Sequence, residues 1–416
     1  MQRPSVPEIH NPAALNQAAR PLIAFYAPLK PPTHPNPSGD RLLGRLLQQA
    51  LHRAGFEPQL ASIFRSYDRD GDPTRQQRLK AIATRLAARL IRRYQRLPAA
   101  QRPALWFSYH LYHKAPDWIG PIVSRALQIP YVVVEASYAR KQADGPWHLG
   151  LQDSAEALQQ AAMVLCLNPA DHAGIRQCRA DAPLHALAPF LDLTPFDQLD
   201  GSVSKAHLAR TFASYPSPSP PPNSPLDPTK SWLICVAMMR PGDKLRSYQK
   251  LSEALQPLKG QQWQLIVVGD GKARNEVENA FSTLRSQVCF TGKLSPQQLQ
   301  PLLHASDLYL WPAVNEAFGM ALLEAQAAAT PVLAGDEGGV SSVVDDGNSG
   351  WLVAAGDSRA FSDQLQRLLQ QPQRLQQAGQ QAQQRVTQRH SLDAAGQRLR
   401  QLLSPLINAA TDRPDR

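Results

Sequence analysis

The sequence predicts a doubly wound α/β protein of two domains, and three observations support this. Short apolar runs that suit buried strands alternate with helical stretches from residue 22 onward. The alternation lapses over residues 214–230, where prolines exclude core elements, and then starts again. The chain has 416 residues, whereas a single hydrophobic core rarely grows past about 250–300 residues.

The first half opens with a strand, a loop and a helix, the unit that begins a doubly wound domain. Residues 22–26 are the strand, a proline-rich loop follows over 28–37, and leucines then recur at helical spacing until Gly55 ends the helix. Residues 74–96, rich in Arg, Leu and Ala, predict an amphipathic helix. Further strands are expected at 104–107, 131–134 and 163–167.

The second half repeats the alternation more regularly. Strands are expected at 232–237, 264–268, 288–290, 308–311 and 331–334. Helices are expected at 248–258, from 273, at 296–305 and at 320–329. A glutamine-rich tail over 358–406 keeps leucines at helical intervals, which favours amphipathic helices with a break at Pro372.

The composition is that of a globular protein with an excess of basic residues. Hydrophobic residues make up 43% and charged residues 19% of the chain, which excludes a disordered protein. Lys and Arg number 44 against 34 Asp and Glu, a formal charge of +10. This charge suits an anionic membrane surface, a nucleic acid or phosphorylated small molecules, and a solvated basic surface explains it equally well. The same two explanations stay open for Arg85, Arg89, Arg92 and Arg93 on the helix expected over 74–96.

Cysteine usage and the absence of long apolar runs favour a cytoplasmic protein. The four cysteines are far apart and match no metal spacing, so free thiols in a reducing compartment are expected. Residues 1–21 are polar and contain prolines, which argues against a signal peptide or an anchor. No apolar run approaches the roughly 18–20 residues that span a bilayer. We expect a cytoplasmic location with contact at the inner face of the membrane as an open alternative.

The most informative motif is the stretch NEAFGMALLEA, residues 315–325, which places two carboxylates around a strand-to-helix turn. Such a turn directs free amides and the positive end of a helix dipole at one point, which suits a phosphate. Gly319 allows a ligand to approach the backbone. Glu316 before the helix and Glu324 within it can accept hydrogen bonds from sugar and ribose hydroxyls. Acidic residues that merely stabilise a helix terminus are the alternative.

Three further stretches also follow expected strands of the second half. Gly269, Asp270 and Gly271 follow one strand, and Arg240 and Lys244 follow another. The two basic side chains could neutralise a diphosphate leaving group. A turn with two glycines over 338–347 follows a third strand. Because parallel strands end at one edge of a sheet, all these groups should gather there.

The second half resembles glycosyltransferase family 4, whose members have the GT-B fold. The family's pair of glutamates separated by seven residues stands here as Glu316 and Glu324. The Gly-Gly-Val and Asp-Asp-Gly segments of residues 338–347, followed by Gly-Trp-Leu-Val at 350–353, resemble the next segment of the family. The resemblance therefore implies a GT-B protein with two Rossmann-like domains that face a central cleft.

By this resemblance, Glu316 faces the donor sugar and Glu324 the ribose. The amides around Phe318, Gly319 and Met320 bind the diphosphate, together with Lys244. The family's usual arginine lies five residues before that lysine, whereas Arg240 lies four before it. The remaining donor-binding residues we expect are Gly269 and Asp270.

The first half resembles the family more loosely. Gly39 occupies the first loop, where the family usually has a glycine pair near donor and acceptor. His110 is our candidate for the histidine of the catalytic region, with His113 in reserve. Glu135 stands near the place of a second histidine and is expected on the acceptor side. A structural role is the alternative for both histidines.

The resemblance implies a retaining hexosyltransferase that needs no metal and no cofactor. A sugar would pass from a UDP- or GDP-sugar to an acceptor hydroxyl, in surface polysaccharide or glycolipid assembly. The catalytic residues would be His110, Glu316 and Lys244. A front-side substitution, with the leaving phosphate as base, is the mechanism that the family implies.

Three other functions compete with this hypothesis. An inactive nucleotide-sugar-binding scaffold is the main alternative, although both glutamates and Lys244 are present. A Rossmann oxidoreductase lacks a convincing G-x-G-x-x-G loop. A nucleic-acid-binding protein is suggested only by the charge, and we expect no nucleic-acid partner. The predicted domains are 1–193 on the acceptor side, a linker over 194–230, a donor domain over 231–390, and a helix and tail over 391–416 that return to the first domain.

Overall fold

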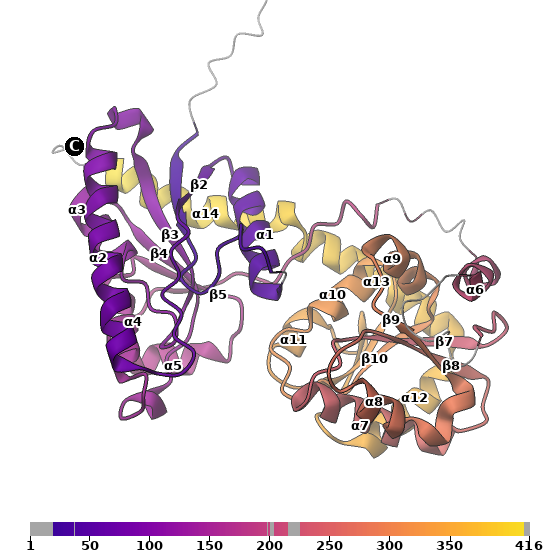
Figure 1. Ribbon diagram of the computed structural model, residues 1–416. Coiled ribbons are helices and arrows are strands. Elements are labelled where there is room, and N and C mark those ends of the chain that lie inside the picture. The colour runs from indigo at the N-terminus through magenta and orange to yellow at the C-terminus, as the bar shows by residue number, and fades with distance from the viewer. Residues whose placement is uncertain (1–19, 37, 198, 200–203, 215–224, 412–416) are drawn as a thin grey trace, which may run out of the picture.

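The computed structural model describes residues 20–36, 38–197, 199, 204–214 and 225–411, which form two α/β domains side by side (Figure 1). Each domain holds one six-stranded sheet, and every pairing between the named strands is parallel. The two-domain fold expected from the sequence is therefore present. The expected absence of a signal peptide falls largely on residues 1–19, outside this part of the chain.

The first sheet has the strand order β2-β1-β3-β4-β5-β6. Its central strands are buried on both faces, because helices cover both sides of a parallel sheet. The strands are β1 (Leu22–Tyr26), β2 (Glu57–Ser62), β3 (Pro103–Leu111), β4 (Tyr131–Ala136), β5 (Met163–Cys166) and β6 (Leu184–Ala186). The helices are α1 (Gly39–Arg53), α2 (Pro73–Gln95), α3 (Gly120–Leu127), α4 (His148–Gln160) and α5 (Asp171–Cys178), with short 3-10 turns η1 (Ala99–Gln101) and η2 (Arg140–Gln142).

The second sheet has the strand order β12-β11-β10-β7-β8-β9. Its strands are β7 (Ser231–Val236), β8 (Trp263–Val268), β9 (Val288–Gly292), β10 (Leu308–Trp311), β11 (Val332–Asp336) and β12 (Gly350–Ala354). Its helices are α7 (Asp243–Leu255), α8 (Arg274–Ala280), α9 (Pro296–Ala305), α10 (Met320–Ala327), α11 (Val340–Val343), α12 (Ser358–Leu369) and α13 (Pro372–Arg389), with η3 (Gln256–Leu258) and η4 (Ser282–Gln287).

Side-chain caps define where the first helices begin. Ser38 accepts a hydrogen bond from the Arg41 amide, so α1 begins at Gly39, three residues before the expected leucines. Asp72 caps α2 in the same way, and Pro73 fits the first helical position. These caps explain why both helices begin before their apolar pattern does.

The segment expected to be a linker, 194–230, contains helix α6 (Lys205–Ser214), which was not predicted from the sequence. Phe212 of this helix is buried and belongs to the core of the second domain. The proline-rich stretch predicted to be an exposed loop falls mainly on residues 215–224, which lie outside the described part of the chain.

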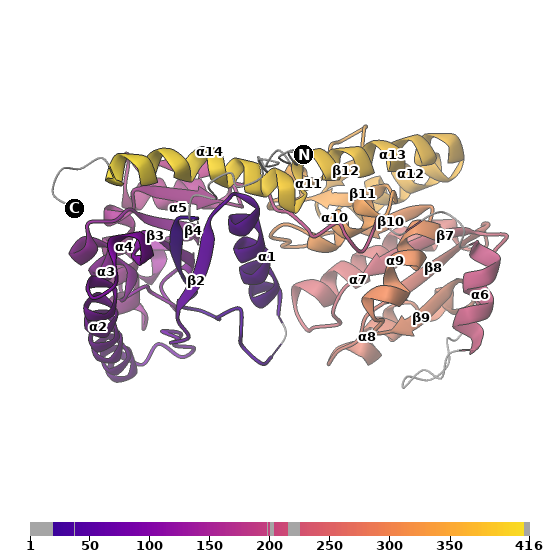
Figure 2. The same cartoon turned by 90° about the horizontal axis from the view of Figure 1, so that it is seen from above.

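The last helix, α14 (Leu392–Thr411), leaves the second domain and packs along the first, as Figure 2 shows. Its residues Leu399, Leu403 and Ile407 are buried in the same cluster as Leu47 and Leu51 of α1. The first domain is therefore completed by the end of the chain.

Two segments of the chain cross from one domain to the other, and these segments are hydrogen-bonded to each other. The Leu191 amide donates to the His390 carbonyl at 2.7 Å, and His390 Nδ1 lies 2.7 Å from the Pro189 carbonyl. The helices of the tail are thus interrupted near residue 390 as well as at Pro372. The interruption near residue 390 marks the crossing between the domains.

All four cysteines are unpaired, and Cys166, Cys235 and Cys289 are buried. Burial raises the pKa of the Cys289 thiol to about 12, which makes it unreactive. In the part of the chain that the structure describes, no helix combines the length and the apolar character needed to cross a bilayer.

Candidate active site

The carboxylate of Glu316 lies in the loop between β10 and α10, at the carboxyl edge of the second sheet. Its Oε2 accepts a hydrogen bond from Trp311 Nε1 at 2.9 Å and from Lys244 Nζ at 2.5 Å. The Lys244 ammonium also lies 5.1 Å from the centre of the Trp311 ring. The structure therefore brings Glu316 and Lys244 together, from segments that are far apart in the sequence.

The loops that carry these two residues are tied together beside the ion pair. Asn315 adopts a left-handed backbone (φ 51°), and its side chain donates to Asp243 Oδ2 at 2.7 Å. The Val314 amide donates to Ser247 Oγ at 3.1 Å. Asp243 and Ser247 both lie on α7. Asp243 directly precedes Lys244, and Ser247 lies about one turn after it. These bonds fix the start of α7 against the Glu316 loop.

Gly319 is the N-cap residue that precedes helix α10, and its φ of 69° favours glycine. A side chain at this position would meet Leu322 Cδ1 at 2.6 Å. The first amides of a helix have no acceptor within it, and no acidic side chain stands in the first turn of α10 to neutralise them. Phe318 and Met320 flank this turn and are both half-buried. The turn is thus suited to an anion.

Glu324 lies one turn further along α10 and is half-buried. Burial raises the pKa of its carboxyl to about 7. Its charge near neutral pH therefore depends on what binds beside it.

The two glycines of the Gly269-Asp270-Gly271 turn are needed for packing. Their φ values are 144° and 156°, and side chains there would lie 2.0 Å from the Ala237 carbonyl oxygen and 2.3 Å from that of Met239. The Met239 amide donates to the Asp270 carbonyl at 3.0 Å. This turn therefore supports the loop after β7, which leads to Lys244.

Arg240 is exposed, and its guanidinium lies 3.1 Å from Met238 Sδ. The structure does not join it to the pair of Lys244 and Glu316.

The glycine pair after β11 packs against the Glu316 loop. Gly338 has a φ of 62°, and a side chain there would lie 2.0 Å from the Glu316 carbonyl oxygen. The Gly339 amide donates to the Ala317 carbonyl at 2.9 Å. The three turns after β8, β10 and β11 and the start of α7 thus meet at one edge, as the order of the strands predicts.

In the first domain, His110 and Glu135 stand opposite each other at the ends of β3 and β4. Their flanking residues pair in register, Tyr109 with Val134 and Leu111 with Ala136. Both adopt left-handed backbone, with φ of 72° and 56°, which strains residues other than glycine and recurs at functional sites. The sequence gives no sign of this geometry.

The neighbours of this pair are also charged. His110 Nδ1 lies 3.7 Å from Asp40 Oδ1, and Asp40 follows Gly39, the first residue of α1. Burial, with the nearby charge of Asp40, raises the pKa of Glu135, although the charge of His110 lowers it. Burial, with the charge of Glu135, raises the pKa of Asp171 to about 6. These four side chains, Asp40, His110, Glu135 and Asp171, are called the carboxylate–histidine cluster below.

His113, the reserve candidate, lies apart from this cluster. Its ring packs against Trp147 with the centres 5.8 Å apart, and burial together with Lys114 and Lys141 lowers its pKa. A structural role explains it.

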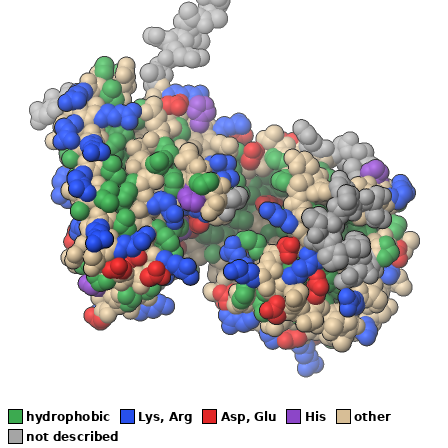
Figure 3. Space-filling model, in the orientation of Figure 1, with side chains coloured by type: hydrophobic (Ala, Val, Ile, Leu, Met, Phe, Trp, Pro, Cys, Tyr) green, Lys and Arg blue, Asp and Glu red, His purple; other side chains and the backbone are tan. Residues whose placement is uncertain are grey.

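The carboxyl edges of the two sheets approach each other across the space between the domains, which Figure 3 shows as a hollow. Asn168 Nδ2 lies 3.5 Å from the Ala317 carbonyl oxygen, and Phe318 packs against the core of the first domain. Asn168 stands three residues before Asp171. The carboxylate–histidine cluster therefore lies close to the Glu316 loop.

Sequence reasoning did not find Asp40, Asp171 or Trp311. Asp40 stands next to Gly39 in the expected loop, which could have indicated it. Asp171 and Trp311 carry no motif, and only the fold places them.

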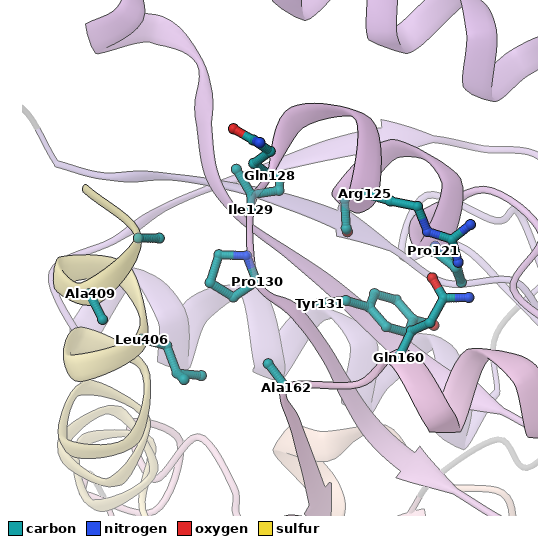
Figure 4. A pocket seen from close by; sticks show the side chains of 12 residues that line it. Pro121, Arg125, Gln128, Ile129, Pro130, Tyr131, Gln160, Ala162, Leu406 and Ala409 are labelled. Atoms are coloured by element: carbon teal, nitrogen blue, oxygen red, sulfur yellow. The ribbon is translucent and has the colours of Figure 1, made fainter. Parts of the chain in front are cut away.

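A separate groove of about 470 Å³ lies at the opposite edge of the first sheet (Figure 4). It is lined by Pro130 and Tyr131 at the start of β4, by Ala162, and by Leu406 and Ala409 of α14. Because it lies where the strands begin, the groove is remote from the cluster.

Comparison with known structures identifies the architecture. The Anabaena protein HepE, solved in complex with UDP, superposes with a TM-score of 0.66 over 92% of this chain and 100% of that protein, at 16% identity. The fold is GT-B. Both Rossmann-like domains expected from the sequence are thereby confirmed.

Comparison of sequences concerns mainly the second domain. Residues 227–385 match the family model described as Glycosyl transferases group 1. Alpha-D-kanosaminyltransferase of Streptomyces kanamyceticus is 29% identical over 143 residues, 34% of this chain and 37% of that protein. D-inositol 3-phosphate glycosyltransferase of Rhodococcus erythropolis is 30% identical over 203 residues, 46% of this chain and 42% of that protein. The chain thus matches less than half the length of these relatives, and the matches support a GT-B glycosyltransferase.

Proposed function

We propose that the protein is a retaining glycosyltransferase that moves a sugar from a nucleoside diphosphate sugar to an acceptor hydroxyl. The observation that carries this proposal is the junction of Lys244, Glu316 and the first turn of α10, within the segment that matches the group 1 family. It places a cation, a carboxylate and free amides at one edge of the sheet, the groups that a sugar diphosphate needs.

Each donor-site residue has a role that follows from its position. The Lys244 ammonium and the amides around Phe318, Gly319 and Met320 bind the diphosphate and stabilise the charge that develops on it. Glu316, held by Trp311, accepts hydrogen bonds from the sugar. Glu324 accepts them from the ribose hydroxyls.

Other predicted residues act at the rim of this site. Arg240 is exposed, so it can reach the diphosphate once the nucleotide is bound. Gly269 and Asp270 hold the turn beside it. We propose a UDP- or GDP-sugar as donor; that HepE, a structural neighbour, was solved in complex with UDP supports a nucleotide sugar as ligand.

The reaction balances without a metal or a cofactor. The bond from the anomeric carbon to the diphosphate oxygen breaks while the acceptor oxygen bonds to the same face. The acceptor proton passes to the departing phosphate, which is the base. His110 lies on the acceptor side, where it can hydrogen-bond the sugar or the acceptor.

Closure of the two domains would exclude water from the reacting sugar. The paired crossings at Leu191 and His390 provide a narrow connection about which such a motion can occur. A closed state limits hydrolysis of the donor.

The setting in the cell is a further part of the proposal. Four exposed arginines of α2 suit contact with an anionic membrane, and unpaired buried cysteines suit the cytoplasm. Acceptors at the inner face of the membrane, in surface polysaccharide or glycolipid assembly, would fit both features.

The test is acceptor-free hydrolysis of a panel of UDP-, GDP- and ADP-sugars. We expect slow release of one nucleotide by the wild type and its loss in Glu324→Ala. Glu276→Ala, which changes an exposed glutamate on α8, is the matched control and should keep the release. If no donor is turned over and none raises the melting temperature, the protein is not a transferase. Binding of a donor without turnover, with or without an acceptor, would instead favour the nucleotide-sugar-binding scaffold.

A further inference from the structure

Trp311, the last residue of β10, touches three parts of the donor site at once. It is 2% exposed, so its indole N–H needs an acceptor inside the protein. That acceptor is Glu316 Oε2 at 2.9 Å, five residues further along the chain. Two side chains of α7 lie against the ring, with the Lys244 ammonium 5.1 Å and the Tyr248 ring centre 5.3 Å from its centre. One indole thus meets the carboxylate, the ammonium and the helix that carries the ammonium.

The loop after Trp311 is folded so that Glu316 turns back to this indole. Ala313 is buried with a φ of 58°, and Asn315 has a φ of 51°. Left-handed backbone of this kind strains residues other than glycine and is kept where the surrounding structure requires it. The Glu316 amide donates to the Ala313 carbonyl at 3.2 Å, which closes the turn. The place of Glu316 beside the indole is therefore set by the fold of its own loop.

The two partners of Glu316 differ in how firmly each is held. The Lys244 side chain is 33% exposed and ends a flexible four-carbon stem. The indole of Trp311 is buried and packs against Tyr248, whose hydroxyl donates to the Ala237 carbonyl at 2.8 Å. Lys244 can therefore turn to a ligand, whereas the indole stays where it is.

A sugar diphosphate competes for both members of the ion pair. Lys244 Nζ and Glu316 Oε2 are in direct contact at 2.5 Å, so each charge neutralises the other in the free protein. In the proposed reaction the diphosphate takes the ammonium, and the sugar hydroxyls take the carboxylate. A free nucleoside diphosphate also takes the ammonium but offers the carboxylate no hydrogen-bond donor, which is costly for a half-buried acceptor.

We infer that Trp311 is a positioning residue, which holds Glu316 in place while Lys244 exchanges this carboxylate for the donor diphosphate. The inference rests on the proposed function, because it assigns a further residue to that same site. The exchange strengthens the binding of a sugar nucleotide relative to that of the free nucleotide, since only the sugar gives Glu316 new partners. Without the indole, the carboxylate is free to turn away from the sugar, and this advantage decreases.

The test compares Trp311→Phe with Trp232→Phe in the full-length protein. Phenylalanine keeps an aromatic ring in the core but removes the indole N–H. Trp232 of β7 is the matched control, because it is fully buried in the same core and donates to the Asp227 carbonyl at 2.8 Å. The Lys205 ammonium also lies 5.5 Å from the centre of its ring. Both variants lose a buried hydrogen bond, and only Trp311→Phe loses one to Glu316. Thermal melting shows whether each variant folds.

Calorimetry measures the affinities for UDP, UDP-glucose, GDP and GDP-mannose, and the nucleotide that binds is used with its sugar conjugate. We expect Trp311→Phe to weaken the sugar nucleotide about tenfold and the free nucleotide less than about threefold. The kcat for hydrolysis of the sugar nucleotide should also decrease about tenfold. Trp232→Phe should change each of these quantities less than about threefold.

A double-mutant cycle with Glu316→Ala shows whether Trp311 acts through Glu316. Glu316→Ala removes the ion pair, so Lys244 is free for the diphosphate, and the free nucleotide should bind about threefold or more tightly. When Glu316 is already alanine, adding Trp311→Phe should leave the ratio of the two affinities unchanged, because the indole has no carboxylate to hold.

The inference is overturned if Trp311→Phe weakens free and sugar nucleotide equally, if it behaves as Trp232→Phe does, or if its effect persists beside Glu316→Ala. Weaker binding of the free nucleotide by Glu316→Ala would contradict the exchange of Lys244. If the wild type binds none of the four compounds, the proposed function itself is contradicted. Failure that is confined to the variants contradicts this inference alone.

Discussion

At the scale of single residues, the donor site depends on how one carboxylate is held. Trp311 and Lys244 both donate to Glu316 Oε2, so this oxygen is fixed before any ligand arrives. The other oxygen of Glu316 stays available for a sugar hydroxyl. Lys244 then has two tasks, because it orients Glu316 and carries the charge that meets the diphosphate.

We expect Lys244→Ala to lower kcat/KM for donor hydrolysis by about 10²–10³-fold, because a positioned group is lost where charge develops. Steady-state kinetics with the donor found in the panel measures this. Lys250→Ala removes a lysine of the same helix whose partner, Glu253, is exposed, and should be neutral. Equal activity of the two variants would contradict the role of Lys244.

Glu324 gives the site a dependence on pH. Its pKa of about 7 means that the free protein holds this carboxyl partly protonated at neutral pH, whereas a ribose is best bound by the ionised form. We expect nucleotide affinity to rise as pH rises from about 6 to 8, the range around that pKa. In Glu324→Gln this rise should be smaller, leaving only the titration of the nucleotide itself. Calorimetric titration of UDP across this range compares the two proteins.

The same raised pKa affects folding. Because the folded pKa lies above that of an exposed glutamate, the folded state holds the proton more tightly, and its stability decreases as pH rises toward and through 7. Glu324→Gln should remove this part of the decrease. A variant with the wild-type pH profile of melting would show that Glu324 is not buried as described.

At the scale of elements, the turns after the strands are built around close backbone contacts. Gly338 and Gly347 both have positive φ, of 62° and 78°, but only Gly338 touches another turn. A side chain at Gly338 would lie 2.0 Å from the Glu316 carbonyl oxygen, whereas nothing lies within 4 Å at Gly347.

We therefore expect Gly338→Ala to be the more harmful of two matched changes. Both variants bear the backbone strain of a left-handed residue, roughly 1–2 kcal/mol, but only Gly338→Ala displaces the Glu316 loop. It should lower the melting temperature further and weaken donor hydrolysis. If Gly347→Ala impairs hydrolysis as much, contact between the two turns is not what matters.

The basic face of α2 leads to another prediction at this scale. Arg85, Arg89, Arg92 and Arg93 are exposed, and Ile82 beside them is 38% exposed. We expect the protein to sediment with vesicles that contain anionic lipid, and less so at high salt. Replacing the four arginines with glutamine should abolish this, while neutral vesicles serve as the reference. Unchanged sedimentation would contradict membrane contact through α2.

Most helices and strands could be predicted from the sequence, because residues that are buried in the fold stand out as apolar runs. The strands missed, β2, β6 and β12, are all edge strands. The residues of β2 and β6 are largely half-exposed or exposed, so no apolar run marks them, and β12 is buried only at Gly350 and Trp351. Helix α6 was missed because prolines follow it directly. The left-handed backbone of His110 and Glu135 depends on where the strands end against other loops, which no local pattern shows.

For the site, motifs predicted the second domain better than the first. Glu316, Lys244 and the glycine turns lie together because they end parallel strands of one sheet, and strand order follows from general rules. Asp40 contacts His110 from a distant segment, and Asp171 interacts with His110 only through its charge, so nothing local indicates either aspartate.

At the scale of the whole molecule, the end of the chain belongs to the first domain. Helix α14 packs on α1, and Leu403 is fully buried there. We expect Leu403→Ala to destabilise the first domain by about 2–5 kcal/mol, because it leaves a cavity. Leu42→Ala changes a leucine of α1 that is 49% exposed and should have an effect within about 0.5 kcal/mol. Urea unfolding measures both, and equal effects would contradict the packing of α14.

The measurement that tests the central claim most directly is proton NMR of donor hydrolysis at early times, before the released sugar mutarotates. A retaining transferase whose donor lies between Lys244, Glu316 and α10 should release a sugar with the anomeric configuration of the donor, and Lys244→Ala should slow this release. Release of the opposite anomer, or no release from any donor in the panel, would contradict the account.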